Sequence, residues 1–436
     1  MSTVKRVEVY YEGWGESWHW GTLVSTKLAT QYPQISFQYS DEAKKRKIEL
    51  SSYKLPLNGP DLRSNFPDHQ MGLPGPVYDA MPDGWGLLLM DRLFKQRGLN
   101  AARIGPLDRL TFVGSNALGA MTFVPVAEEG QLSTEDIPLE NLASEVQEVQ
   151  QGEGGAFLER LVKMGGSPQG ARPKALLYRY PDGRFTTAAS AELEPWLVKF
   201  PANQEHPEVC AIEDAYAACL RQCKIATPQT NYFFLPGGGT AFASKRFDRV
   251  NGMKVPMQSL AAFAGADFRQ PGSLDYVNFL RATQKCTLDL SQRVLAFERA
   301  VFNVIFNNRD DHPKNFAFLM SKSGQWSLAP AYDVTFCEGP GGYHQMDIMG
   351  EALDIDRSHL IRLAIEEAEI QSTAAEAIID RFAGVGKNFS EIAKALHPNA
   401  ITKKTLNHIQ STIDENIARM EVKLSPLVKN RSRQKL

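Results

Sequence analysis

The chain is poor in cysteine and lacks long hydrophobic runs. Its five cysteines are odd in number and none stands at the CxxC spacing of redox or zinc motifs, which argues against a disulfide framework and a zinc knuckle. No apolar run approaches the ~20 residues of a membrane span, and the N-terminal sequence lacks the apolar region of a signal peptide. We therefore expect a cytoplasmic protein without membrane association, whose cysteines are reduced thiols in the core.

The chain also lacks a large net charge of either sign. Its 48 lysines and arginines nearly balance its 50 aspartates and glutamates, so a broad basic surface for nucleic acid is not expected, and only a local patch stays open. The eight histidines are scattered and no HExxH motif occurs, which argues against a histidine-based zinc site.

What the chain does have is length and apolar content. It contains 436 residues, of which 43% are hydrophobic and 10% are aromatic. At ~150 residues per domain this length predicts two or three domains. The composition is sufficient for several hydrophobic cores and argues against wholesale disorder.

Strand-like alternation of polar and apolar residues is typical of the first ~125 residues. The stretch 83–94 instead has helical periodicity, and Gly84 and Gly86 beside Trp85 indicate close packing or a special backbone turn. The acidic stretch 127–138 contains several turn-forming residues and predicts the end of a first domain.

The rest of the chain changes from strands to helices. Hairpins at 174–188 and 230–247, a short strand at 196–200 and a helix at 208–223 predict a small sheet lobe. Beyond Arg249 the periodicity is mostly helical. We predict an α+β fold in which this sheet lobe and a larger helical lobe enclose a cleft. The predicted domains are an N-terminal β-rich subdomain at 1–126, a sheet lobe at 139–248 and a helical lobe at 249–436.

The densest polar cluster is the stretch 307–315, NNRDDHPKN, which follows an apolar helix. So many polar side chains cannot all be buried without partners, which predicts a loop at a cleft. Arg309, Asp310 and Asn315 satisfy R-D-x-x-x-x-N, the catalytic-loop pattern of protein kinases. In that pattern the Asp orients or takes the proton of the attacking hydroxyl and the Asn holds magnesium. Asn308 stands where the pattern has histidine, and a capping turn rich in Asp and Asn is the alternative interpretation.

A second carboxylate follows downstream. Asp333 comes after a short apolar segment, in the place of the second metal ligand of a kinase. Magnesium with ATP is usually held by one or two carboxylate or amide side chains besides the phosphates. Asn315 and Asp333 are therefore candidate magnesium ligands, although Asp333 in isolation could equally cap a turn or a helix.

Two further features suit phosphate binding. The stretch 164–174, MGGSPQGARPK, is rich in glycine, so its backbone N–H groups could approach phosphates and Arg172 or Lys174 could add charge. It matches neither a Walker A motif nor GxGxxG, and a plain surface loop is the alternative. Lys199 lies within the apolar stretch 196–200, which is costly unless its ammonium reaches water or an anion. The strand lysine of kinases contacts ATP phosphates; an edge-strand lysine is the alternative.

The order of these features, together with several literal strings, resembles the HipA family of bacterial serine/threonine kinases. Members of this family are the toxins of HipBA-type toxin–antitoxin systems. The matching strings lie at 72–75 (GLPG), 82–86 (PDGWG), 167–174 (SPQGARPK), 245–249 (KRFDR), 311–315 (DHPKN) and 330–333 (PAYD). They cover nearly the whole chain, and the resemblance implies a two-lobed, protein-kinase-like α+β fold with an N-terminal β-rich subdomain.

The resemblance implies roles for individual residues. Asp310 is expected to be the catalytic base, and Asn315 and Asp333 are expected to hold Mg²⁺. The expected ATP-binding residues are Lys199 at the phosphates, Gly166, Ser167 and Gly170 in the loop over the nucleotide, His312, and Lys245 and Phe247 of the hinge at the adenine. Glu213, on the helix after the strand lysine, is a candidate structural partner in the same lobe.

Ser167 occupies the place of the family's autophosphorylated serine. In the family, phosphorylation there ejects the loop and inactivates the kinase. A dianionic group near the phosphates of ATP would be repelled, which gives a physical reason for such a switch.

The resemblance also implies partners and targets. The family's characterised substrates include aminoacyl-tRNA synthetases, notably the enzyme for glutamate, and the outcome of their phosphorylation is growth arrest. The usual partner is HipB, a helix-turn-helix antitoxin that binds operator DNA. Since no helix-turn-helix pattern is evident in this chain, we expect contact with DNA only indirectly, through such an antitoxin.

Two other functions stay open at the level of sequence. Asp310, Asp311, His312 and Asp333 could hold two metal ions in a phosphoesterase or nuclease, which would need neither Lys199 nor the glycine-rich loop. A pseudokinase that binds an antitoxin and regulates transcription is the third hypothesis, although the full set of kinase residues counts against it.

Overall fold

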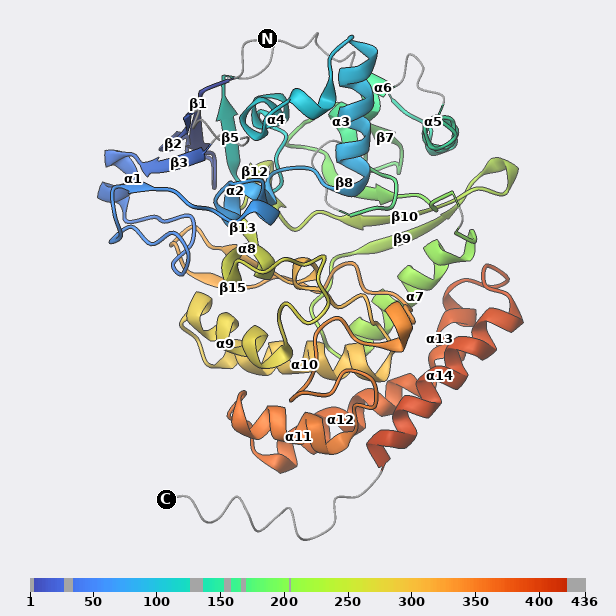
Figure 1. The fold of residues 1–436 in the computed structure, drawn as a ribbon. Coiled ribbons are helices and arrows are strands. Elements are labelled where there is room, and N and C mark those ends of the chain that lie inside the picture. Colours follow the sequence, from blue (N-terminus) through green and yellow to red (C-terminus); the bar gives the residue numbers. More distant parts are fainter. Residues whose placement is uncertain are drawn as a thin grey trace, which may run out of the picture. The chain divides into compact units, whose positions relative to one another are not determined.

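The computed structural model describes residues 4–26, 34–125, 136–152, 158–165, 170–203 and 205–421 (Figure 1). The chain divides into two compact units. The first comprises Met1–Cys210, Pro228–Asp267 and Ala317–Ala329, and the second comprises Ala211–Thr227, Phe268–Phe316 and Pro330–Leu436. The first unit carries the larger sheets and the second is mainly helical, so the predicted α+β class is confirmed.

The N-terminal part of the first unit is a five-stranded antiparallel sheet with the strand order β4-β3-β2-β1-β5. Its strands are β1 (Arg6–Tyr11), β2 (Trp18–Thr26), β3 (Gln34–Tyr39), β4 (Leu62–Arg63) and β5 (Met121–Val124). Alternate residues of β1 are buried, as the period of two predicts. Helices α1 (Asp41–Arg46) and α4 (Pro106–Val113) pack against β2 and β1, respectively.

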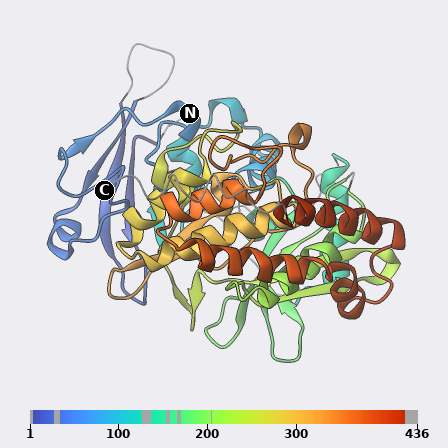
Figure 2. The same ribbon diagram turned by 90° about the horizontal axis from the view of Figure 1, so that it is seen from below.

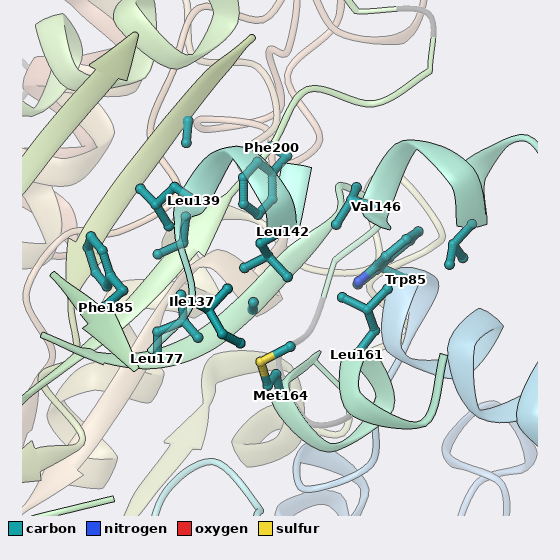
Figure 3. Packing of buried hydrophobic residues seen from close by; sticks show 14 of the residues in the cluster. Trp85, Ile137, Leu139, Leu142, Val146, Leu161, Met164, Leu177, Phe185 and Phe200 are labelled. Atoms are coloured by element: carbon teal, nitrogen blue, oxygen red, sulfur yellow. The ribbon is translucent and has the colours of Figure 1, made fainter. Parts of the chain in front are cut away.

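The second sheet of this unit, also antiparallel, has the order β7-β6-β8-β10-β9. Its strands are β6 (Lys174–Arg179), β7 (Phe185–Thr186), β8 (Glu194–Lys199), β9 (Thr230–Phe234) and β10 (Thr240–Lys245). The pairs β6–β7 and β9–β10 confirm both predicted hairpins. Figure 3 shows buried residues of the core that includes this sheet, with Leu177 beside Ile137 and with Leu142 between Phe185 and Leu161 in this view. Leu142 belongs to helix α5 (Leu139–Gln150) and Leu161 to helix α6 (Leu158–Gly165), and Trp85 of the same cluster lies at the start of helix α3 (Gly84–Gln96).

Five short strands beyond Arg249 also belong to the first unit, and the sequence did not predict them. They are β11 (Arg249–Val250), β12 (Met253–Lys254), β13 (Met257–Ser259), β14 (Ala317–Met320) and β15 (Trp326–Leu328). Strands of two to four residues carry too little alternation to be recognised. Two short helices, α2 (Gly75–Asp79) and α8 (Leu260–Ala264), pack against each other beside β13.

The second unit is built around α10 (Ser291–Ile305), whose last ten residues are buried except for Glu298. Its helices are α9 (Tyr276–Thr287), α11 (Arg357–Glu366), α12 (Ser372–Gly386), α13 (Phe389–Leu396), α14 (Lys403–Glu421) and most of α7 (Glu208–Gln222). Helices α9, α11, α12 and α14 all contact α10, and Figure 2 shows several of them side by side. Glu213 is buried on α7. The helix predicted at 208–223 and the apolar helix expected before the stretch 307–315 are confirmed as α7 and α10.

Single turns of 3-10 helix connect several elements. They are η1 (Asp68–Gln70), η2 (Ala101–Arg103), η3 (Pro236–Gly238), η4 (Pro313–Asn315) and η5 (Pro340–Gly342). All five cysteines are free thiols; four are buried in the core, as predicted, whereas Cys337 is partly exposed. Among the described residues, no helix is both long and apolar enough to cross a membrane.

Candidate functional site

The polar stretch 307–315 begins where α10 ends, and hydrogen bonds fix its first residues. Asn307 has a φ of 54°, in the left-handed region that asparagine tolerates better than most residues. Its side-chain nitrogen donates to the carbonyl of Cys337 (3.1 Å), and its side-chain oxygen accepts from Asn416 of α14 (3.2 Å). Asn308 forms a parallel bridge with Cys337. The stretch is therefore tied to α14 and to the segment that follows Asp333.

Asp310 and Asn315 meet within this stretch. The side-chain nitrogen of Asn315 donates to the main-chain carbonyl of Asp310 (2.7 Å), and the side chain of His312 caps the turn between them. The Asp310 side chain is 45% exposed, and its Oδ1 lies 3.6 Å from Nε2 of His312. The same oxygen accepts a hydrogen bond from Nε2 of Gln345 (3.0 Å). The stretch thus presents a carboxylate that solvent can reach, with its backbone held by Asn315.

Asp333 lies on a segment that is bonded to the same stretch. The Tyr332 hydroxyl donates to the carbonyl of Lys314 (2.6 Å), and the N–H of Ala331 donates to the carbonyl of Ala226 (2.7 Å). Asp333 has a φ of 55°, a conformation that is uncommon for a residue with a side chain and that clusters at functional sites. Asn315 and Asp333 therefore belong to adjoining segments of the second unit, and their amide and carboxylate oxygens suit Mg²⁺.

Asp311 has a different environment from Asp310. It is fully buried, and its carboxylate accepts hydrogen bonds of 2.8 Å each from the Tyr276 hydroxyl, Nδ1 of His344 and the N–H of Gln345. Burial, and then the charge of Asp311, raise the pKa of Tyr276 well above its ordinary value, so this hydroxyl stays a donor. A buried carboxylate with three donors is poorly placed to ligate a metal ion, which counts against the two-metal hydrolase.

The first unit holds two buried lysines on neighbouring strands. Lys174 begins β6 and Lys199 ends β8, and the two are register partners in the antiparallel pair, so their side chains project from the same face. They are 2% and 3% exposed, and Nζ of Lys199 lies 5.7 Å from the ring centroid of Phe242. This pairing places two positive charges side by side on one face of the sheet, and ammonium groups are chemically suited to phosphate oxygens.

From the sequence, Arg172 and Lys174 were alternative sources of positive charge for the glycine-rich loop. In the structure the two side chains have different surroundings. Nε of Arg172 donates to Glu205 (2.9 Å). Lys174 instead lies directly beneath Gly170, because a Cβ on Gly170 would sit 2.5 Å from its Nζ. Gly170 has a φ of 104°, which glycine adopts without steric cost. Gly166 and Ser167 lie outside the described residues.

The PDGWG string at 82–86 holds the end of the glycine-rich loop. The Asp83 carboxylate accepts a short hydrogen bond from the N–H of Gly170, and the N–H of Trp85 donates to the Gly170 carbonyl (3.1 Å). Gly84 has a φ of 42°, and a Cβ there would sit 2.6 Å from that carbonyl oxygen and 2.8 Å from Cα of Ala171. The predicted close packing and special turn both occur at Gly84.

Gly84→Ala is expected to destabilise the protein by about 2–5 kcal/mol, since a left-handed alanine costs about 1–2 kcal/mol and forced overpacking about 1–3 kcal/mol. Gly72→Ala is the matched control, because Gly72 also has a positive φ of 69° but nothing lies within 4 Å of an added Cβ. Urea unfolding of both variants measures the difference. Equal losses of stability in the two variants would show that the contact with the glycine-rich loop is not the reason why position 84 requires glycine.

The predicted hinge begins at the end of β10. Nζ of Lys245 donates to Glu194 on β8. The N–H of Lys245 donates to the carbonyl of Gln229, and the N–H of Arg246 donates to the carbonyl of Pro195, both at 2.9 Å. Phe247, which follows, is half-buried. The main-chain donors of Lys245 and Arg246 are thus engaged within the sheet.

The next residue, Asp248, is the centre of a buried ionic cluster. Its carboxylate accepts from Nε and Nη2 of Arg246 (2.9 and 2.8 Å), Nη1 of Arg249 (2.7 Å) and the N–H of Gly119 (3.0 Å). Arg249 also donates to the carbonyls of Ala117 and Gly119. Burial alone would raise the pKa of Asp248, but the two arginines outweigh it and hold that pKa far below its ordinary value. The KRFDR string therefore joins β10 to the N-terminal subdomain, a role that the sequence did not reveal.

Comparison with known proteins gives two family matches. Residues 14–124 match the HipA N-terminal domain, and residues 166–389 match the HipA-like C-terminal domain. No curated protein sequence matches the chain.

The solved structures that are similar to this chain include a toxin and a kinase. The HipA toxin of Shewanella oneidensis MR-1, solved with HipB and operator DNA, aligns with a TM-score of 0.70 at 17% identity, over 95% of this chain and 97% of that one. The Helicobacter pylori proinflammatory kinase CtkA aligns with a TM-score of 0.39 at 14% identity, over 57% of this chain and 90% of that one. The first match shows a shared fold over almost the full length of both chains.

Proposed function

Because the chain belongs to the HipA family, we propose that it is an ATP- and Mg²⁺-dependent serine/threonine protein kinase that acts as the toxin of a toxin–antitoxin pair. The observation that carries this proposal is the arrangement of the stretch 307–315. The Asn315 side chain holds the Asp310 backbone, the Asp310 carboxylate reaches solvent, and Asp333 follows on an adjoining segment with a left-handed backbone.

In this proposal the second unit supplies the chemistry of transfer. Asp310 orients the substrate hydroxyl and accepts its proton as the hydroxyl oxygen bonds to the γ-phosphorus, while the bond from that phosphorus to the β,γ-bridging oxygen breaks and ADP leaves. Asn315 and Asp333 would hold Mg²⁺, which neutralises charge on the phosphates when bound. Positioning and charge neutralisation supply most of the barrier reduction in such transfers. His312, which caps the turn before Asn315, stays a candidate nucleotide contact.

The first unit would supply the phosphate and adenine contacts. Lys199, and with it Lys174, would pair with phosphate oxygens, while Gly170, Gly166 and Ser167 belong to the loop over the nucleotide. The backbone of 245–247 would meet the adenine. Since the N–H groups of Lys245 and Arg246 already have acceptors, we assign that contact to the carbonyls of this stretch and to Phe247.

Replacement of either buried lysine is expected to weaken ATP binding. Hydrogen bonds to charged groups contribute about 1.5–3 kcal/mol, so Lys199→Met and Lys174→Met should each raise the Kd for Mg-ATP by ~10- to 150-fold. Isothermal titration calorimetry measures this effect. Lys322→Met, at an exposed lysine, is the control and should bind as the wild type does. Unchanged affinity in both buried variants would contradict the assignment of this face to phosphate.

The proposal extends to partners and regulation. The Shewanella HipA structure contains HipB and operator DNA, which supports a HipB-like helix-turn-helix antitoxin as the partner, with DNA reached through it. We further propose a cytosolic protein target, with aminoacyl-tRNA synthetases as the first candidates, and autophosphorylation at Ser167. Co-expression of the tagged chain with a HipB-like protein tests the partner, and failure to copurify would contradict it.

A transfer assay tests the activity itself. Incubation with radiolabelled γ-phosphate ATP and Mg²⁺, followed by phosphoamino-acid analysis, should place label on serine or threonine. Release of inorganic phosphate without labelled protein would indicate a hydrolase, and ATP binding without either product would indicate a pseudokinase.

A further inference from the structure

Gln345 joins the proposed catalytic carboxylate to a buried network. Its side-chain Nε2 donates to Oδ1 of Asp310 (3.0 Å), and its main-chain N–H donates to Oδ1 of Asp311 (2.8 Å). Its carbonyl accepts from the N–H of Gly272 (2.8 Å). One residue thus contacts two consecutive carboxylates, one with its side chain and one with its backbone. From this arrangement we infer that Gln345 is a positioning residue for Asp310, an inference that rests on the proposed kinase function.

The anchor of Gln345 is the buried carboxylate of Asp311. Asp311 and Tyr276 are 0% exposed and His344 is 5% exposed, so the hydrogen bonds of Asp311 are shielded from water. A charged acceptor strengthens each of these bonds, and loss of one donor would leave buried polar capacity unmet. The backbone of Gln345 is therefore held independently of its own side chain.

The same network extends to α10, the helix that precedes the stretch 307–315. Nδ2 of Asn303 donates to the Tyr276 hydroxyl (2.9 Å), and Nδ2 of Asn308 donates to Oδ1 of Asn303 (2.9 Å). Both asparagines are buried. The segment that carries Gln345 and the stretch that carries Asp310 are thus fixed to one set of side chains, which determines where the amide meets the carboxylate.

The amide of Gln345 restrains an otherwise half-exposed carboxylate. The terminal torsion of an aspartate is broad, so each contact with the Asp310 carboxylate, which is 45% exposed, narrows the range of its orientations. A hydrogen bond to Oδ1 selects one orientation, and the donor is neutral, so it restrains the carboxylate without the charge of a lysine or arginine. Gln345 would act on the rate of transfer through Asp310 and would leave ATP binding unchanged.

Two variants separate this role from packing. Gln345→Ala removes the amide but keeps the main-chain bond to Asp311, and Gln345→Glu keeps the shape while replacing the donor by a negative acceptor. Gln270→Ala, at an exposed glutamine near Gly272, is the matched control. We expect both Gln345 variants to lower kcat for phosphate transfer by ~10- to 100-fold. The KM and Kd for Mg-ATP and the thermal unfolding midpoint of Gln345→Ala should stay within experimental error of the wild type, and Gln270→Ala should match it throughout.

Each outcome decides the inference. Wild-type kcat in Gln345→Ala, or restored kcat in Gln345→Glu, would overturn the positioning role and leave the kinase proposal intact. If the loss of kcat is accompanied by weaker ATP binding or by a lower unfolding midpoint, Gln345 has a structural role instead. If the wild-type protein binds ATP but transfers no phosphate, the kinase proposal fails and this inference fails with it.

Discussion

Asp310→Ala is expected to lower phosphate transfer by ~10²- to 10⁴-fold, the range that a positioned general base contributes, while ATP binding stays largely intact. The Asp310 carboxylate is half exposed, and Asn315 holds the main-chain carbonyl of Asp310 rather than its side chain, so removal of the carboxylate should not disturb this backbone. Single-turnover transfer and calorimetric binding of Mg-ATP measure the two quantities separately.

Asp333→Ala provides the contrast within the same unit, because a magnesium ligand acts on binding as well as on transfer. This variant should weaken Mg-ATP binding, whereas Asp310→Ala should not. Asp354→Ala, at an exposed aspartate of the same unit, is the control and should match the wild type in both binding and transfer. Wild-type turnover by Asp310→Ala would refute its assignment as the base.

Asp248→Asn is expected to destabilise the protein by about 3–5 kcal/mol, the cost of removing one partner from a buried ion pair. The substitution keeps the size of the side chain but removes the buried carboxylate that Arg246 and Arg249 share; their side chains are only 7% and 9% exposed. At ~2–4 °C per kcal/mol, the unfolding midpoint should fall by ~6–20 °C.

A matched control comes from a second Asp–Arg pair with the same sequence spacing. Asp182 pairs with Arg184 at 2.9 Å, but their side chains are 55% and 60% exposed, so Asp182→Asn should leave the midpoint unchanged. Differential scanning calorimetry compares the two variants. If Asp248→Asn melts with the wild type, the cluster does not stabilise the junction with the N-terminal subdomain.

The same cluster predicts a dependence on pH. Because the folded-state pKa of Asp248 is depressed, its contribution to stability is fully present above the unfolded pKa of ~3.9 and is lost as pH falls toward the folded value. The difference in unfolding free energy between the wild type and Asp248→Asn should therefore be constant near neutral pH. It should shrink as the pH falls below ~4, which urea unfolding across that range measures.

Local patterns were sufficient to predict much of the fold. Alternation and turn residues located the hairpins at 174–188 and 230–247, and periodicity located α7 and α10. The pairing of Lys174 with Lys199 could not be predicted, because strand register is set by contacts between segments that are distant in sequence. The strands β13 to β15 were missed for another reason, because three or four residues show too little alternation to be recognised.

The site was predictable only where a residue type and a spacing together indicate chemistry. Asp310, Asn315 and Asp333 stood out because acidic and amide side chains at kinase spacing suit magnesium and proton transfer. Gln345 carries no such signal, since a glutamine in a loop has no distinctive pattern. Asp248 lay within a recognised string, but its two arginines and Gly119 are brought together only by folding.

Peptide mass spectrometry of the purified chain after incubation with Mg-ATP, beside Asp310→Ala, tests the central claim most directly. Both proteins are first treated with phosphatase and confirmed unphosphorylated. A single phosphate on Ser167 in the wild type alone is the predicted result, and it would establish kinase chemistry, the role of Asp310 and the modified loop together. No phosphate on the wild type, or equal phosphorylation of both proteins, would contradict the assignment of Asp310 as the base of a self-phosphorylating kinase.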